Sequence, residues 1–162
     1  MAMITSAQSV SDKNKKKLVR PEKCDVAEVD QFVTSCFDSY DESVKITEDI
    51  NFIKVEGDGQ NTPLIITNGK GETLTKEAAL LQLGELAIRA KKQSDNIKNL
   101  ENLKKSAAEG VKKCSVAKKP KASKNLTKGG EALTEVGKET KNQVGLIDKQ
   151  ITFLKQIKDS KK

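Results

Sequence analysis

The chain has 162 residues, of which 35% are hydrophobic, 33% are charged and only 3% are aromatic, and its formal net charge is +7. This composition fits one domain with a thin aliphatic core and excludes a deep globular interior. His is absent, which removes the commonest general base and the commonest metal ligand. We therefore expect a protein that is not an enzyme and that holds no metal and no cofactor. No run approaches the roughly eighteen apolar residues that a transmembrane segment requires.

The first residues, Met1 to Ala7, read MAMITSA and resemble the small-residue end of a secretory signal, without its charged and fully apolar parts. They are a clipped export signal, a vector-derived leader or a native start. We favour the first, which predicts a secreted or periplasmic protein; a cytoplasmic protein is the alternative. Residues 8–23 are polar, basic and aperiodic. We predict that residues 1–23 form a disordered basic arm before one helical-bundle domain over 24–162.

The first helix is predicted from Asp25 to about residue 49. Asp25 and Glu28 have the spacing of a capping box, in which each side chain accepts a hydrogen bond from a free amide of the first turn. Apolar residues then follow at steps of three and four, and this richest aromatic face predicts the centre of the core. They are Val29, Phe32, Val33, Cys36, Phe37, Tyr40 and Val44.

Residues 51–75 interrupt the helical pattern and predict a small β insertion. Two β-branched runs, NFIKV and PLIIT, are separated by a polar, Gly-rich loop. Asn68-Gly69 then predicts a type I′ hairpin turn, because both of its central positions need positive φ. We expect strands near 52–56, 63–67 and 71–74, packed on the helices because a lone hairpin is marginal in water.

The second helix is predicted over 76–117, with Thr75 as its N-cap and Glu77 favourably placed in the first turn. It ends before Pro120. A heptad count gives two seam positions and a moderate coiled-coil signal. The first seam holds Leu83, Ala90, Ile97, Lys104 and Val111, and the second holds Leu86, Gln93, Leu100, Ala107 and Cys114.

A basic connector is predicted over 115–128, followed by a third helix that starts clearly by Glu131. Several glycines weaken this helix, so it must rely on tertiary packing. If the hairpin closes near residue 121, Gly145 lies opposite Ile97; alternatively the glycines mark local flexibility. The apolar stripe of the third helix is Leu133, Val136, Val144, Ile147, Ile151, Leu154 and Ile157.

These elements predict a mainly all-α fold. The architecture is an antiparallel three-helix bundle, or a long helical hairpin, with a small β-hairpin or meander inserted at about 51–75 between the first two helices.

Charge is unevenly distributed along the chain. Residues 1–23 hold six basic against two acidic side chains, residues 104–128 hold nine against one, and residues 24–103 hold eight against fifteen. If the first two helices are antiparallel, both basic segments meet at one end of an otherwise acidic rod. That end is a candidate site for nucleic acid or another anionic surface, although no aromatic residues interleave for base stacking. The alternative is a solvated face. The candidate lysines are Lys15, Lys16, Lys17, Lys112, Lys113, Lys118, Lys119, Lys121 and Lys124.

The three cysteines, Cys24, Cys36 and Cys114, form no C-x-x-C pair, which disfavours zinc and thioredoxin-like sites. The antiparallel arrangement brings Cys24 and Cys114 to the same end, where a disulfide would tie the first helix to the hairpin. The alternative is that these thiols never pair. Cys36 lies on the apolar face of its helix and is expected to be buried.

Two short motifs lack the spacing of ligand sites. EGDGQN at 56–61 is not an EF-hand loop, and NGKGET at 68–73 is not a phosphate-binding loop, so both predict turns. We expect a non-catalytic interaction or scaffold protein that binds a protein partner or self-associates. Its surface is the β element at one end or leftover apolar seam at the other. The alternative is a polyanion-binding protein.

Overall fold

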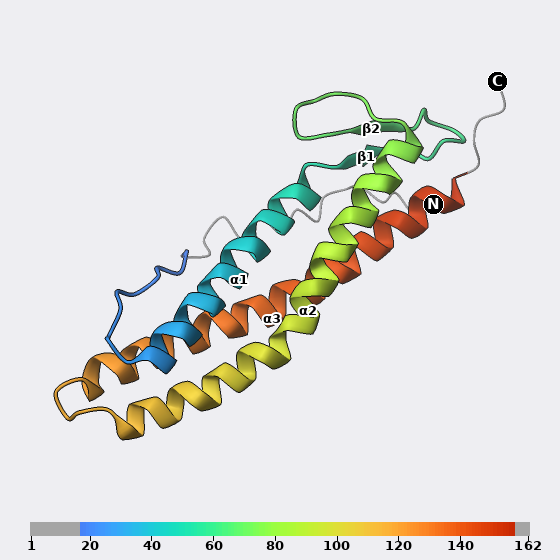
Figure 1. Cartoon of the computed structure of the whole chain (residues 1–162). Helices are drawn as coiled ribbons and strands as arrows, with labels where there is room; N and C mark the ends of the chain where they lie inside the picture. Colours follow the sequence, from blue (N-terminus) through green and yellow to red (C-terminus); the bar gives the residue numbers. More distant parts are fainter. Residues whose placement is uncertain (1–16, 158–162) are drawn as a thin grey trace.

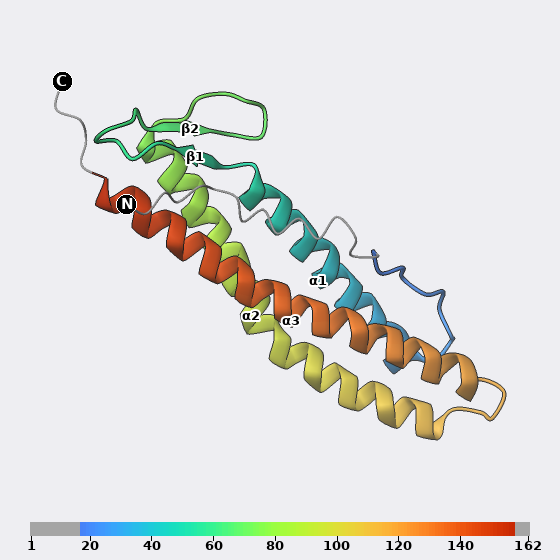
Figure 2. The same ribbon diagram turned by 180° about the vertical axis from the view of Figure 1, so that it is seen from behind.

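A computed structural model describes residues 17–157, and three long helices form its body (Figure 1). The elements in chain order are α1 (Ala27–Asn51), β1 (Lys54–Glu56), β2 (Ile65–Thr67), α2 (Lys76–Lys113) and α3 (Lys119–Gln156). α2 and α3 form an antiparallel hairpin, and α1 packs along both of them (Figure 2). The three-helix bundle with a β insertion between the first two helices is confirmed.

The entry into α1 differs from the predicted capping box. The N-cap residue is Val26, which offers no side-chain hydrogen bond, and Asp25 has a left-handed backbone with φ of 58°. The carboxylate of Asp30 instead accepts hydrogen bonds from the amides of Cys24, at 2.8 Å, and Asp25, at 3.0 Å. The capping-box prediction is therefore wrong, because an acid inside the helix fixes the chain ahead of it.

Residues 17–23 belong to the predicted disordered arm, yet they lie along α1. The amide of Leu18 donates to the Tyr40 hydroxyl at 3.3 Å, and Arg20 pairs with Asp38 at 2.6 Å and Asp41 at 3.3 Å. This segment therefore runs antiparallel to α1, from the middle of the helix to its start. The prediction is wrong for this part of the arm; residues 1–16 lie outside the described residues.

The β insertion is a two-stranded antiparallel sheet in which Val55 faces Ile66. The third predicted strand is reduced to a single bridge between Thr67 and Thr73. The expected packing on the helices is present, since Ile53 and Ile66 are buried in the core.

The turn at Asn68-Gly69 is not type I′. The amide of Gly71 donates to the Asn68 carbonyl at 2.9 Å, and the left-handed residue is Gly71, with φ of 77°. The amide of Asn68 donates to the carbonyl of Glu72 at 3.0 Å, so the loop has three residues, 69–71. This is a type I turn followed by a left-handed glycine, the next commonest hairpin loop.

α3 starts at Lys119, so most of the predicted connector over 115–128 is helix. Pro120 lies in the first turn, where its missing N–H leaves no hydrogen bond unmade, and it therefore starts the helix instead of interrupting it. The tight turn covers only residues 114–118. The hairpin closes earlier than expected, and an added Cβ at Gly145 would meet no atom within 4 Å, so the pairing of Gly145 with Ile97 is wrong.

A different glycine provides the close helix contact. A Cβ added at Gly129 would lie 2.6 Å from Cε1 of Phe32, so only glycine lets this ring pack directly on α3. Gly110 has a similar role on α2, because its Cβ would lie 3.3 Å from Val26 and 3.2 Å from Glu28.

The predicted seams largely face the core. Of the ten seam residues on α2, six are buried, whereas Lys104 is exposed and the neighbouring Leu103 is half-buried in its place. On α3 the stripe is buried or half-buried except at Val144. A coiled-coil geometry stays a prediction.

Two hydrophobic clusters fill the bundle. The turn-end cluster lies near the α2–α3 turn and comprises Cys24, Val26, Val29, Phe32, Val33, Cys36, Phe37, Leu100, Ala107, Ala122, Ala132 and Leu133. The β-end cluster lies beside the small sheet and comprises Ile46, Ile50, Ile53, Ile66, Ala79, Leu83, Leu86, Ala90, Ile147 and Leu154.

Buried polar side chains lie between the two clusters, and we call them the polar belt: Ser39, Ser43, Gln93, Thr140 and Gln143. The amide nitrogen of Gln93 donates to the Ser39 carbonyl at 3.0 Å. That of Gln143 donates to the Ser43 carbonyl at 2.8 Å and to the Thr47 hydroxyl at 2.8 Å. The belt therefore joins α2 and α3 to the middle of α1.

Candidate functional site

The turn end gathers most of the candidate anion-binding lysines. Lys112 and Lys113 occupy the last turn of α2, and four more lie at the start of α3 or just before it. These four are Lys118, Lys119, Lys121 and Lys124. All six side chains are exposed.

The arm does not bring Lys17 to this end. Leu18 contacts Tyr40, thirteen residues after the first residue of α1, so the neighbouring Lys17 lies about 20 Å from the start of that helix. The expectation that the arm emerges beside the connector is therefore wrong for Lys17. Lys15 and Lys16 lie outside the described residues.

Several of the turn-end lysines already have partners. Lys112 pairs with Glu109 at 2.7 Å, which lowers the pKa of Glu109 through the hydrogen bond and the charge of the lysine. Lys121 lies 3.9 Å from the Glu22 carboxylate, and Lys118 donates to the carbonyl of Asp25 at 2.9 Å. The positive field at this end is therefore partly neutralised.

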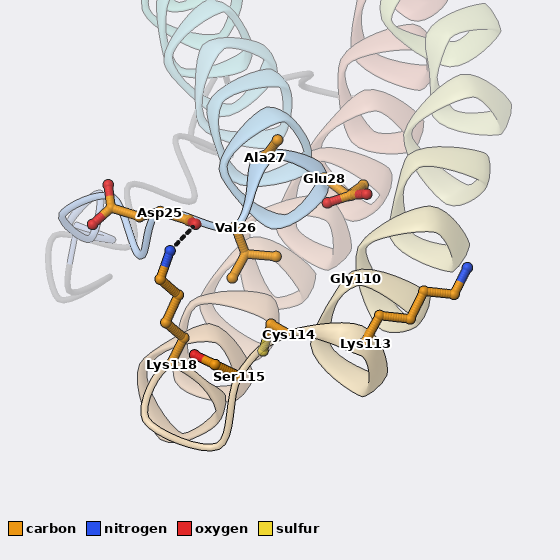
Figure 3. A pocket seen from close by; sticks show the side chains of 9 residues that line it. All are labelled: Asp25, Val26, Ala27, Glu28, Gly110, Lys113, Cys114, Ser115 and Lys118. Atoms are coloured by element: carbon orange, nitrogen blue, oxygen red, sulfur yellow. Dashed lines mark hydrogen bonds between the residues drawn. The ribbon is translucent and has the colours of Figure 1, made fainter.

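A shallow pocket of about 350 Å³ lies between the start of α1 and the α2–α3 turn (Figure 3). Acidic residues (Asp25 and Glu28) and basic residues (Lys113 and Lys118) both line it. In Figure 3 Lys118 reaches across to the Asp25 carbonyl, whereas the amine of Lys113 points away from the pocket. The mixed charge gives this pocket no clear preference for an anion.

Cys36 has the predicted burial. Cys36 is fully buried, and burial raises the pKa of its thiol to about 12. Cys24 and Cys114 both pack in or against the turn-end cluster, as the antiparallel arrangement predicted. They are free thiols in the structure: the Cys24 thiol donates to Asp30 at 3.3 Å and the Cys114 thiol donates to the Val111 carbonyl at 3.3 Å. The disulfide stays a prediction.

The opposite end contains a second cleft, of about 400 Å³, between α2 and the hairpin loop. Arg89 of α2 lies in its wall and pairs with Glu42 at 2.8 Å and Asp49 at 2.6 Å. The hydrogen bond that Arg89 donates to Glu42 raises the pKa of Arg89. The lining residues are Asp49, Phe52, Ile53, Asn68, Gly69, Lys70, Gln82, Glu85, Leu86 and Arg89.

Phe52 is the distinctive side chain of this cleft. It follows the last residue of α1 and is 51% exposed. A Cβ added at Gly69 would lie 2.4 Å from the Phe52 ring, so the glycine of the loop allows close contact with the aromatic side chain. The sequence indicated Gly69 only as a turn residue, and its packing role was not predicted.

Large apolar side chains also remain exposed near this end. Ile65 on β2 is 45% exposed, and Leu81 and Ile88 on α2 are 67% and 59% exposed. The heptad count assigned the core face of α2 and left these two residues out. Their spacing of seven was a visible signal of a second apolar stripe.

The two short motifs are turns, as predicted. Asp58 accepts hydrogen bonds from the amides of Thr62, Gln60 and Asn61, which hold the pKa of its carboxyl well below its usual range. The side chain of Asn68 accepts from the amides of Lys70 and Glu72. Both polar side chains are thus occupied by their own loops.

Within residues 17–157, no group of three or more Cys, Asp or Glu side chains is arranged to hold a metal ion. The helices of this part of the chain also lack any stretch apolar enough to cross a bilayer. Comparisons with protein-family models, with curated proteins and with solved structures found no match.

Proposed function

We propose that the protein is a non-catalytic interaction or scaffold protein that binds a protein partner at its β end. The observation that supports this is Phe52, a half-exposed aromatic ring at the mouth of a cleft. Aromatic and Arg side chains in partly buried positions dominate the energetics of protein interfaces. Arg89 in the cleft wall is held by two carboxylates, so the surface is ordered before a partner arrives.

Charge around the cleft indicates the kind of partner. Residues 52–88 hold three Lys and no Arg against five Asp or Glu. Arg89, which lies in the cleft wall, is already paired with Glu42 and Asp49. A segment with an apolar anchor and basic flanks would complement this surface. The export of the protein to the periplasm or the medium stays a prediction that accompanies this proposal.

Photo-cross-linking at position 52 tests the proposal. A benzoylphenylalanine replaces Phe52 in the full chain, expressed in cells of the source organism, and Val116 at the turn end, 81% exposed, receives the same group as a control. We expect a discrete adduct from position 52 and none from position 116. The captured protein, purified, should bind the native chain, and Phe52→Ala should weaken binding about tenfold or more. Equal adducts from both positions, or no adduct, would refute the proposal.

A second candidate function, binding of polyanions, is favoured by the start of α3. This first turn has no acidic residue and no side-chain cap, so the positive end of the helix dipole adds to the field of the exposed lysines around it. Binding through these point charges would be steeply salt-dependent and without base specificity.

Heparin chromatography tests this alternative with two matched variants. One replaces the six turn-end lysines with Gln, and the other replaces six exposed lysines elsewhere: Lys45, Lys54, Lys98, Lys141, Lys149 and Lys155. If the turn end binds polyanions, only the first variant elutes at clearly lower salt. Equal shifts would show a response to net charge alone and would exclude a turn-end site.

A further inference from the structure

The first half of α2 has an apolar stripe on its outer face that the fold does not use. Leu81 and Ile88 lie seven residues apart, and both are mostly exposed. They point away from the core face, which holds Leu83 and Leu86. Gly84 lies between them on the same side, and a Cβ added there would meet nothing within 4 Å. The stripe is therefore a ridge of two aliphatic side chains with an open backbone between them.

Charges of opposite sign flank this stripe. Glu77 lies one turn before Leu81, and Lys91 and Lys92 follow Ile88. All three side chains are exposed. Along the helix the order is acid, aliphatic, glycine, aliphatic and base. When a second copy lies antiparallel, the acid of each copy faces the bases of the other, and the aliphatic side chains face each other.

We propose that this outer face of α2 binds a second copy of the chain in antiparallel orientation, about a two-fold axis between residues 84 and 85. In this register Leu81 packs on Ile88 of the second copy, and Ile88 packs on its Leu81. Glu77 then lies between Lys91 and Lys92 of the second copy at each end. The two Gly84 residues near the axis let the helices approach closely.

The charges select this partner and this orientation. A parallel pair would place Glu77 against Glu77 and Lys92 against Lys92, and like charges in contact are unfavourable. The antiparallel pair turns each repulsion into an attraction. The proposal rests on the proposed function of binding and names a second copy as a partner. Apart from Glu85 beside the axis, it uses residues that do not line the cleft. Two aliphatic side chains per copy make a small contact, so the dimer is weak and concentration-dependent.

Sedimentation of the full chain tests the pairing through charge reversal. Glu77→Lys alone, and Lys91→Glu with Lys92→Glu, should each raise the dissociation constant about tenfold or more. An equimolar mixture of the two variants should associate again, because every reversed charge then meets its opposite. Circular dichroism checks that each variant remains helical. A native chain that stays monomeric, or a mixture that associates no better than its components, would overturn the proposal.

Cysteine cross-linking tests the register. Chains with Leu81→Cys and with Ile88→Cys, tagged differently and mixed under mild oxidation, should form mainly the 81–88 product, above the background of the native thiols. A predominance of 81–81 and 88–88 products would overturn the antiparallel arrangement. If these dimers fail while the adduct at position 52 forms, the self-association is wrong and the proposed partner-binding function stands.

One variant should strengthen the dimer. Glu85 lies beside the two-fold axis in both copies, where the two carboxylates repel each other. Glu85→Gln should therefore lower the dissociation constant about twofold, in line with the few tenths of a kcal/mol typical of like-charge pairs on helices. A weaker dimer would contradict the proposed axis.

Discussion

The turn-end and β-end clusters bury their large side chains in different ways. At the turn end, Phe32 and Phe37 of α1 meet small residues of the other helices, such as Ala107 and Gly129. At the β end the buried side chains are aliphatic, and the β insertion supplies part of the cover through Ile53, just before β1, and Ile66 of β2. The turn-end half leaves only single valines exposed, Val19 and Val116, among the large apolar side chains of the described residues. The β-end half leaves Phe52, Ile65, Leu81 and Ile88 exposed.

The turn end therefore contributes mainly to stability, and the β end offers surface for recognition. Large rings against small residues give close helix packing and little unfilled space. The β end, with its short strands and exposed apolar groups, has surface left for partners. The first prediction below therefore contrasts one position in each half. The later ones compare positions within α3 and among the cysteines, and they run from the largest expected effect on stability to the smallest.

The two phenylalanines, Phe32 and Phe52, should give the largest contrast. Phe32 is fully buried, and Phe32→Ala should lower the free energy of unfolding by about 3–5 kcal/mol, because it removes a buried ring and leaves a cavity. Phe52→Ala should cost less than about 1.5 kcal/mol, since half of its surface already faces water. Urea denaturation measures both. Equal costs would contradict the division between the two halves.

Two glycines of α3 should respond in opposite directions. Gly129→Ala places a methyl group against the buried Phe32 ring and should destabilise the protein by about 1–3 kcal/mol. Gly137→Ala meets no atom within 4 Å and should stabilise it by up to about 1 kcal/mol, because alanine favours helix. Thermal unfolding of the two variants, measured side by side, checks the sign. A stabilising Gly129→Ala would show that α3 does not approach α1 as described.

The polar belt between the two halves offers an intermediate effect. Gln143→Ala removes the donor to the Ser43 carbonyl and the Thr47 hydroxyl and should cost about 1–3 kcal/mol in unfolding free energy. Gln150→Ala, at a half-buried position on the same helix, serves as a control and should cost less. Chemical denaturation measures both variants. Equal losses of unfolding free energy would contradict a particular contribution of the polar belt.

The cysteines should differ in reactivity with little effect on stability. At pH 8 a thiol with a pKa of about 12 is deprotonated in roughly one molecule in ten thousand, so Cys36 should resist maleimide until the chain unfolds. Burial also raises the pKa of Cys24, and the half-buried Cys114 should react first. Mass spectrometry of labelled peptides gives this order. The same peptides, after mild oxidation, would reveal a Cys24–Cys114 bond if it forms.

Much of the fold was predictable because apolar periodicity directly reports a buried helix face. The stripe of α3 and the core side of α2 followed from spacing alone, and the Thr75 cap is confirmed by its hydrogen bond from the Ala78 amide at 3.1 Å. The start of α3 was missed because Lys-rich sequence around Pro120 is typical of loops, although Pro is favoured in a first helical turn.

The candidate sites were harder to predict than the fold. Composition indicated the lysines of the turn end, but the sequence could not show that residues 18–22 follow α1 and move Lys17 away from them. The exposure of Phe52 depends on where α1 ends relative to the hairpin loop, which is a tertiary property. The spacing of Leu81 and Ile88 was visible in the sequence. It was missed because a single heptad frame assigns only one face of a helix.

The polar belt has a further consequence for how the three helices find their alignment. Sliding α2 or α3 by one turn, about 5.4 Å, would move Gln93 or Gln143 among aliphatic side chains and leave its amide without a partner. An all-aliphatic interior would tolerate such slippage, because one Leu or Ile replaces another at small cost. The two glutamines therefore disfavour misaligned packing of the helices during folding. A chain with aliphatic residues in their place would populate shifted alignments more readily, even where its native state was more stable.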